Sequence, residues 1–304
     1  MRPRHTSFAL AVWLLTACSP TAPTAAQAPG GLFAYDRSAP LNLDTLRQAD
    51  QGNARIYRIA FDAPGGGRAT GLMAVPTASG RHPAVVLMHG LPGNAQGMMT
   101  LLGTELAARG AIALAIDAPW ARRQGLPDFT PRDSVEQVQL MLDLQRAVDV
   151  LLARPDVDAS RIGYIGGSYG GAMGALFVGI EKRLRAAILF VPDGGLVAHF
   201  TNADGSTTGP LAQQSPEAQA RWLAAMRPIE PITFVGRSSP TPLLIQNGRT
   251  DQLVTNADAE ALHAAAGSPK EIIWYDAGHN LGSLAAAKAD RSRFLATHLG
   301  LPSP

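Results

Sequence analysis

Residues 161–171 read RIGYIGGSYGG, and they give the strongest local indication of the fold. A short apolar run ends in four glycines grouped around one serine, Ser168. Gly166 and Gly170 flank the serine in the G-x-S-x-G spacing of a sharp turn from a strand into a helix, where a side chain at either glycine would collide with its neighbours. The spacing therefore predicts a strand over 161–165, a helix over 168–180, and a serine hydroxyl raised at the carboxyl end of a sheet. A glycine-rich turn with an idle serine is the alternative.

The rest of the chain alternates short apolar runs with longer amphipathic ones, which predicts a mostly parallel, twisted α/β sheet covered by helices on both faces. About eight strands are expected, at 56–61, 71–75, 84–88, 111–116, 161–165, 186–191, 243–246 and 270–275. The expected helices are 94–109, 134–153, 168–180, 256–266 and one from about Leu281. Residues 192–240 are longer than an ordinary connection, so a small cap is expected there, with a helix that begins at Ser215 and Pro216.

Composition favours a single globular domain over residues 32–304. The 304 residues are 46% hydrophobic and 16% charged, and the net charge is +2. No run of Lys or Arg exceeds a pair, so nucleic acid is not an expected partner. No metal-binding cluster, nucleotide loop or phosphate-binding fingerprint occurs in the sequence, so neither a cofactor nor a metal is expected.

The N-terminus is predicted to be a targeting segment rather than part of the fold. Two arginines precede a short apolar run over 8–15, which is typical of a signal peptide, here residues 1–17. The sequence Leu15-Thr16-Ala17-Cys18 resembles the bacterial lipobox, and Cys18 is the only cysteine. We therefore expect an exported cell-envelope lipoprotein anchored to a membrane by a lipid on Cys18, with 18–31 as a flexible tether. Ordinary cleavage after residues 26–28 (AQA), giving a secreted protein, is the alternative.

A serine hydroxyl is a weak nucleophile that needs a base, and the base needs an acid to orient it. After such a turn the expected chain order is Ser, then Asp or Glu, then His. Asp251 and His279 each follow a late predicted strand, where open α/β sheets build their sites. Asp193 is an alternative acid. The other histidines considered are weaker bases by position: His82, His199, His263 and His298.

These segments resemble the α/β-hydrolase superfamily, and within it the dienelactone-hydrolase-like and prolyl-oligopeptidase-like serine hydrolases. The segments that carry the resemblance are VVLMHGLPGN, RAVDVLLARPDVDASRIGYIGGSYGG, LLIQNGRTDQLV and DAGHN, within about 55–300. The resemblance implies that Ser168 is the nucleophile, Asp251 the acid and His279 the base. It also implies an oxyanion hole made of two backbone N–H groups. Tyr169, directly after the serine, and Leu91 in the HGLPG loop are the expected donors.

Three aromatic side chains are candidates for the wall of a substrate pocket: Trp120, Phe200 and Trp222. The alternative is that they pack the core and the cap. Three functional classes follow from the whole pattern. The first is a carboxylesterase that acts on a small-molecule ester through an acyl-enzyme. The second is a prolyl-oligopeptidase-like peptidase, although the chain leaves no room for an N-terminal propeller between the tether and the first strand. The third is a non-catalytic binding lipoprotein. The natural substrate and the oligomeric state are not predicted.

Overall fold

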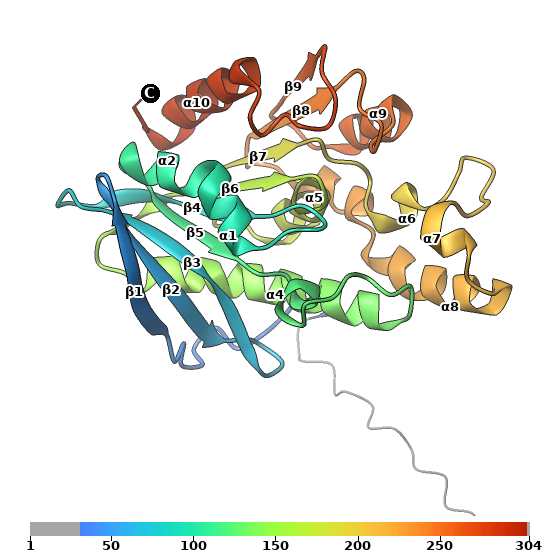
Figure 1. Ribbon diagram of the computed structural model, residues 1–304, viewed down its shortest axis with the longest axis horizontal. Coiled ribbons are helices and arrows are strands. Elements are labelled where there is room, and N and C mark those ends of the chain that lie inside the picture. Colours follow the sequence, from blue (N-terminus) through green and yellow to red (C-terminus); the bar gives the residue numbers. More distant parts are fainter. Residues whose placement is uncertain (1–30, 303–304) are drawn as a thin grey trace, which may run out of the picture.

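The computed structural model describes residues 31–302, which build one nine-stranded sheet flanked by helices (Figure 1). The strands are β1 Asp44–Gln51, β2 Ala54–Asp62, β3 Arg68–Pro76, β4 His82–Met88, β5 Ile112–Ile116, β6 Val157–Gly167, β7 Ala186–Phe190, β8 Leu243–Gly248 and β9 Lys270–Tyr275. The main helices are α1 Ala95–Met98, α2 Thr104–Ala108, α3 Pro119–Arg122, α4 Arg132–Leu152, α5 Tyr169–Ile180, α9 Asn256–Ala265 and α10 Ala285–Leu299. The predicted signal peptide, the tether up to residue 30 and Cys18 lie outside the described residues.

The order of the strands is β1-β2-β3-β5-β4-β6-β7-β8-β9. The first three pairings are antiparallel, and from β5 to β9 all neighbours are parallel. The chain crosses over between β3, β4 and β5, so β4 and β6 lie side by side in the middle of the sheet. The carboxyl ends of the parallel strands therefore meet at one edge, which is the usual place for a site in this kind of sheet. The predicted mostly parallel α/β sheet is confirmed.

Helices cover both faces of the sheet and divide the core into two parts. One apolar cluster joins the sheet to α4, α5 and α9, and the other joins it to α1, α2 and α10. The central strands β4 and β5 are buried along their whole length, which matches their apolar sequences, apart from His82 at the start of β4. α5 is also apolar all round and buried, so the helix that follows Ser168 is anchored in the core.

β1 and the helix after β4 differ from the sequence-based expectation. β1 was not expected, because its sequence DTLRQADQ has no apolar alternation and all of its residues are exposed at the edge of the sheet. It exists through antiparallel pairing with β2. The helix expected over 94–109 does begin after the cap residue Asn94, whose side chain accepts the Gly97 N–H at 2.9 Å, but a π-helical turn, Met99–Gly103, interrupts it.

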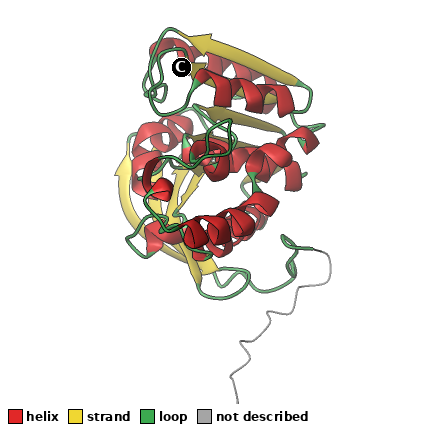
Figure 2. Cartoon of the chain, turned by 90° about the vertical axis from the view of Figure 1, so that its right-hand side faces the viewer, coloured by secondary structure: helices red, strands yellow, loops and turns green. Residues whose placement is uncertain are grey.

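The segment between β7 and β8 carries the cap. It holds three short helices, α6 Leu196–His199, α7 Gly209–Ala212 and α8 Pro216–Met226, followed by three 3-10 turns. The cap lies on the right in Figure 1, and Figure 2 views the molecule from that side. Ser215 caps α8 by accepting the Ala218 N–H at 3.2 Å. Trp222 anchors α8 to α4, because its indole N–H donates to Asp133 Oδ2 at 2.8 Å. Among the described residues no helix combines the length and the apolar character that a membrane crossing requires.

Candidate active site

The turn from β6 into α5 places Ser168 at the carboxyl edge of the sheet in a strained backbone conformation, with φ 53° and ψ −122°. A residue with a side chain rarely adopts a positive φ, so the surroundings must hold it there. The Ser168 N–H donates to Phe190 O at 2.9 Å, and the Tyr164 hydroxyl donates to Gly170 O at 2.6 Å. A Cβ on Gly170 would lie 2.3 Å from Met88 O, so only glycine fits this turn.

Ser168, His279 and Asp251 form a continuous chain of hydrogen bonds. The Ser168 hydroxyl donates to His279 Nε2 at 2.9 Å, and His279 Nδ1 donates to Asp251 Oδ2 at 2.7 Å. The side chain of Asp251 is 1% exposed, whereas that of His279 is 25% exposed. This arrangement can move the serine proton onto the imidazole while the buried carboxylate stabilises the imidazolium that results.

The loops that carry the acid and the histidine are each held by their own contacts. The second oxygen of Asp251 accepts the N–H groups of Leu253 at 2.8 Å and Val254 at 3.1 Å, which fixes the carboxylate in its turn. The loop after His279 is held from α10 by Arg291, whose guanidinium donates to the carbonyls of Leu281 and Gly282. Arg291 is 2% exposed, so these bonds lie in the interior.

The HGLPG loop lies against the serine. A Cβ on Gly90 would be 3.2 Å from the Ser168 Cβ, which shows how closely the loop approaches. His89 holds the loop: its Nε2 accepts the Ala118 N–H at 3.1 Å, so Nδ1 carries the proton and donates to Gly90 O at 2.8 Å. Burial lowers the pKa of His89, which favours the neutral ring that this pairing requires. His89 therefore supports the loop and does not face the serine as a base.

The two expected oxyanion donors lie beside the serine. Leu91 and Tyr169 line the same cavity as Ser168. Neither backbone N–H donates a hydrogen bond to any group within residues 31–302. Two unpaired N–H groups next to a serine hydroxyl can stabilise the negative charge that develops on a carbonyl oxygen under attack.

Ser168 and His279 lie between two cavities. The first, of about 160 Å³, lies under the cap and is lined by apolar side chains such as Met173, Leu196 and Phe200. The second, of about 380 Å³, lies on the other side of the serine and is lined mainly by the HGLPG loop, α1 and the loop after His279. A substrate whose reacting bond lies at Ser168 can therefore extend in two directions.

The aromatic candidates divide between the cavity and the core. Phe200 lies in the wall of the cavity under the cap. Trp222 is 0% exposed and takes no part in that wall, because it packs α8 onto α4. Trp120 is 3% exposed and lies behind Tyr169, with the two rings edge to face at 5.8 Å. The pocket-wall prediction is therefore corrected for Trp120 and Trp222, whose large apolar rings are used for packing.

The alternative acid and the alternative bases are engaged elsewhere. Asp193 Oδ2 accepts a hydrogen bond from His199 Nδ1 at 2.8 Å, so it is paired with a histidine other than His279. His82 contacts two backbone carbonyls, and His263 contacts the Asn247 side chain at 2.9 Å inside the fold. His298 packs on Phe294 at the end of α10. The pair of His199 and Asp193 faces the same cavity as Ser168, and sequence reasoning treated its two members only as separate alternatives to the triad.

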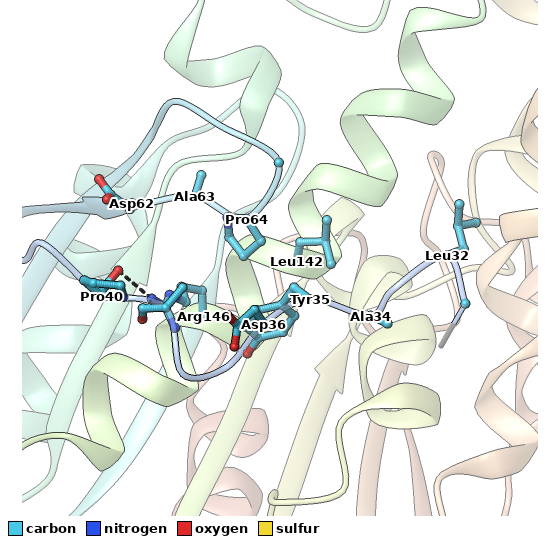
Figure 3. Close-up of a pocket in the computed structure, with 13 residues that line it drawn as sticks. Leu32, Ala34, Tyr35, Asp36, Pro40, Asp62, Ala63, Pro64, Leu142 and Arg146 are labelled. Atoms are coloured by element: carbon cyan, nitrogen blue, oxygen red, sulfur yellow. Dashed lines mark hydrogen bonds between the residues drawn. The ribbon is translucent and has the colours of Figure 1, made fainter. Parts of the chain in front are cut away.

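The largest cavity described, of about 650 Å³, is remote from the serine. Figure 3 shows it between residues 31–40, the turn after β2 and the outer side of α4. Its polar side chains are paired within the fold: Arg146 donates to the carbonyls of Ala39 and Pro40, and Tyr35 donates to Asp149. Asp36 and Asp62 accept from Ser38 and Arg68. Within residues 31–302, no three His, Cys, Asp or Glu side chains are grouped to hold a metal ion.

Comparison with known families connects this geometry to enzymes. The family model described as acetyl xylan esterase (AXE1) matches residues 38–203, and the model of the prolyl oligopeptidase family matches residues 136–300. Each range is more than half of the chain. The first contains the serine turn and the HGLPG loop, and the second contains all three residues of the hydrogen-bonded chain.

Solved structures share the fold at low sequence identity. The acetyl xylan esterase from Paenibacillus sp. R4 superposes with a TM-score of 0.71 at 24% identity, over 88% of this chain and 91% of that one. A putative dienelactone hydrolase from Klebsiella pneumoniae subsp. pneumoniae MGH 78578 superposes with a TM-score of 0.55 at 18% identity, over 86% of this chain and 99% of that one. These likenesses show the α/β-hydrolase fold.

Among curated relatives, an uncharacterised protein of Mycobacterium tuberculosis (strain ATCC 25618 / H37Rv) is 29% identical over 83% of this chain. The chain spans 66% of the length of that relative.

Proposed function

Because this chain belongs to the α/β-hydrolase families described as acetyl xylan esterase and prolyl oligopeptidase, we propose that it is a serine hydrolase that cleaves carboxylic esters. The observation that carries the proposal is the unbroken hydrogen-bonded chain from Ser168 Oγ through His279 to Asp251. The esterase family match and the esterase fold neighbour support an ester rather than another acyl compound as the substrate.

Acylation begins when Ser168 Oγ attacks the ester carbonyl carbon and its proton passes to His279 Nε2. Asp251 stabilises the imidazolium through Nδ1. The negative charge on the carbonyl oxygen is stabilised by the N–H groups of Leu91 and Tyr169. The intermediate then collapses, the C–O bond to the alcohol breaks, and His279 returns the proton to the departing alcohol oxygen.

Deacylation repeats these steps with water as the nucleophile. His279 takes a proton from water, the hydroxyl oxygen attacks the acyl carbon, and Ser168 leaves with the proton that His279 returns. The products are the carboxylic acid, the alcohol and the free enzyme. Water is the only co-reactant, and the reaction needs no external oxidant or cofactor. This is the general course of acyl transfer by a serine, histidine and aspartate acting as one unit.

A peptidase is the second candidate. The prolyl oligopeptidase family model covers all three residues of the triad, and the same steps would cleave an amide with the amine as leaving group. A third candidate is a non-catalytic binding protein with this fold. The free N–H groups and the bonded serine favour catalysis over this last possibility.

The decisive experiment measures hydrolysis of 4-nitrophenyl esters and peptide 4-nitroanilides by the full chain and by Ser168→Ala. We expect ester turnover, and a loss of about 10⁴-fold or more in Ser168→Ala without loss of folding, because the triad acts as a unit. Ser134→Ala, on the outer face of α4, is the matched control. Activity on the amides alone would move the proposal to a peptidase, and retained activity in Ser168→Ala would end it.

The anchoring of the chain is a separate proposal. We propose that Cys18 carries a lipid that holds the protein at a bacterial cell envelope, on the ground of the lipobox-like sequence before it. Fractionation of cells that produce the full chain tests this. Cys18→Ser should move the protein from the membrane fraction, and a Cys18→Ser variant that stays there would contradict the anchor.

A further inference from the structure

The cavity under the cap is lined by a second histidine–aspartate pair as well as by Ser168. His199 ends α6, and its Nδ1 donates to Asp193 Oδ2 at 2.8 Å. The second oxygen of Asp193 accepts the Gly195 N–H at 3.0 Å, so the carboxylate is held from both sides. Both side chains line the cavity into which Ser168 opens.

The ring of His199 has one defined orientation. The bond to Asp193 fixes one edge, and the ring of Phe200 packs edge to face on it, with ring centres 4.7 Å apart. α6 itself is tied to the rest of the cap, because Glu230 Oε1 accepts the Ala198 N–H at 2.9 Å. The Nε2 atom, in contrast, makes no hydrogen bond within residues 31–302. The imidazole of His199 is fixed in the wall of a small cavity, and one of its nitrogens has no hydrogen-bond partner. Such a group is suited to bind a ligand.

The charges around His199 indicate the chemistry of that ligand. The acidic groups near its ring are Asp193, Asp251 and Asp258, and Glu230 lies behind α6. No lysine or arginine is among the described residues that line the cavity. A carboxylate on the substrate would therefore lie near several acidic side chains, and His199 would be a neighbouring group that could carry a balancing positive charge. A neutral hydroxyl avoids that conflict, because it can donate to a neutral Nε2 and can accept from a protonated one.

The two cavities indicate which part of an ester lies under the cap. After acylation the alcohol must leave and water must enter, while the acyl group stays on Ser168. The cavity of about 160 Å³ is covered by Leu196, His199 and Phe200 of the cap, whereas the cavity of about 380 Å³ has no cap residue in its wall. The larger, uncovered side suits the group that departs, so the acyl group occupies the covered cavity.

We propose that His199, held by Asp193, binds a hydroxyl group on the acyl part of the substrate, so that this enzyme prefers esters of hydroxy acids over the same esters without the hydroxyl. This inference rests on the proposed ester hydrolysis. His199 acts as a specificity determinant in it and takes no part in the proton transfers of His279. The remaining apolar wall accepts the carbon chain that carries the hydroxyl.

The test compares kcat/KM of the full chain on 4-nitrophenyl butyrate with its 2-hydroxy- and 3-hydroxybutyrate analogues, which share one leaving group. We expect a preference of about tenfold for at least one hydroxy ester, the size of one hydrogen bond to the substrate. His199→Phe keeps a ring and removes the nitrogen, so it should abolish the preference. His298→Phe, the same substitution at the far end of α10, should leave the preference as it is.

Two further comparisons separate this inference from its alternatives. Ethyl and 2-hydroxyethyl butyrate place the hydroxyl on the alcohol instead, and a preference there that depends on His199 would overturn the acyl assignment. The 4-nitrophenyl hemisuccinate carries a carboxylate, and a preference for it that is lost in His199→Phe would overturn the hydroxyl assignment. Equal ratios in the wild type and His199→Phe would reject the role of His199 while leaving ester hydrolysis intact. Absence of any ester turnover would instead reject the proposed function.

Discussion

The molecule contains two histidine–aspartate pairs with nearly the same local geometry and different surroundings. His279 donates to Asp251 at 2.7 Å from a loop at the end of β9, and His199 donates to Asp193 at 2.8 Å from the cap. The free nitrogen of His279 accepts the Ser168 hydroxyl at 2.9 Å, whereas that of His199 faces a cavity. A fixed imidazole therefore becomes a candidate base only where a nucleophile meets its second nitrogen. Elsewhere it is a candidate ligand-binding group.

The supports of the two pairs differ as well. The loop of His279 is held by the buried guanidinium of Arg291, which belongs to the packed helix α10. The pair in the cap is held by a buried carboxyl group, Glu230, and by short helical elements outside the sheet. The first pair is thus held by an element of the core, and the second belongs to the cap, whose 3-10 turns pack against α5.

Substitution of the two aspartates should give the largest difference in activity between the two pairs. Asp251→Asn removes the carboxylate behind His279 and should lower kcat by about 10⁴-fold, as expected for loss of the correct tautomer and of the charge that stabilises the imidazolium. Asp193→Asn should cost about tenfold or less, because it touches only substrate binding. Steady-state kinetics on 4-nitrophenyl butyrate measure the first effect, and kcat/KM on the preferred hydroxybutyrate ester measures the second. A larger loss in Asp193→Asn would make Asp193 the acid of the triad.

The support of the His279 loop gives the next largest effect. Arg291→Met leaves the Gly282 carbonyl without a donor in the interior, and it also removes the bonds to Leu281 O and to Gln246 Oε1. It should lower the free energy of unfolding by about 3 kcal/mol, in the range for breaking a buried charged network, and should also reduce kcat. Urea denaturation measures the first effect. Arg293→Met, which removes exposed ion pairs with Glu271 and Asp290, should cost less than about 1 kcal/mol, and equal costs for the two would contradict the role of Arg291.

The support of the cap predicts a dependence on pH. Burial raises the pKa of Glu230 to about 8, and one of its oxygens has no partner among the described residues, which suits a protonated carboxyl. Between the usual pKa near 4.5 and about 8, the unfolded chain has lost this proton and the folded chain keeps it. The stability that this carboxyl contributes is complete below pH 4.5. It falls as the pH rises toward about 8, by up to about 1.4 kcal/mol per pH unit.

Glu230→Gln should remove that part of the slope. Denaturation curves at pH 5, 6.5 and 8 measure it, and Glu260→Gln on the exposed side of α9 is the control. A slope in Glu230→Gln as steep as in the wild type would show that Glu230 does not titrate in this range.

The smallest expected effect concerns the attachment of the cap to the core. Trp222→Phe removes the donor to Asp133 while that carboxylate still accepts the N–H groups of Asp128 and Phe129. We expect a loss of about 1 kcal/mol in the free energy of unfolding, with ester turnover preserved. The same substitution at Trp274, which is only partly buried, should cost less. Loss of turnover in Trp222→Phe would mean that the cap positions the triad as well as the substrate.

The sheet could be predicted largely because its strands carry strong local signals. β5 and residues 84–88 of β4 are unbroken apolar runs, and the glycines around Ser168 occur where a tight turn between strand and helix requires them. β1 could not be predicted, since an exposed edge strand needs no apolar face and is held by pairing with β2. Pairing partners are a property of the folded sheet rather than of a short window of residues.

The triad candidates could be chosen from order and position along the chain, and the structure places the three side chains in contact. The residues of the pocket wall could not be chosen from the sequence, because aromatic residues are equally suited to a pocket wall and to packing. Trp222 and Phe200 belong to the same predicted cap, yet only Phe200 faces the cavity. The pairing of Asp193 with His199 needed a spatial view, although a spacing of six residues inside an insertion is a signal that could be sought in other chains.

The close contact between Gly170 and Met88 O has a consequence for sequence drift. A β-carbon at Gly170 would lie 2.3 Å from that oxygen, and one at Gly166 would lie 2.1 Å from Gly170 O. These atoms belong to the backbone, so no change of a neighbouring side chain can compensate. Every single-base change that replaces either glycine therefore meets a steric barrier that a second substitution nearby does not remove. Random mutagenesis under selection for a folded protein should retain glycine at both positions, whereas the sequence of the cap should vary.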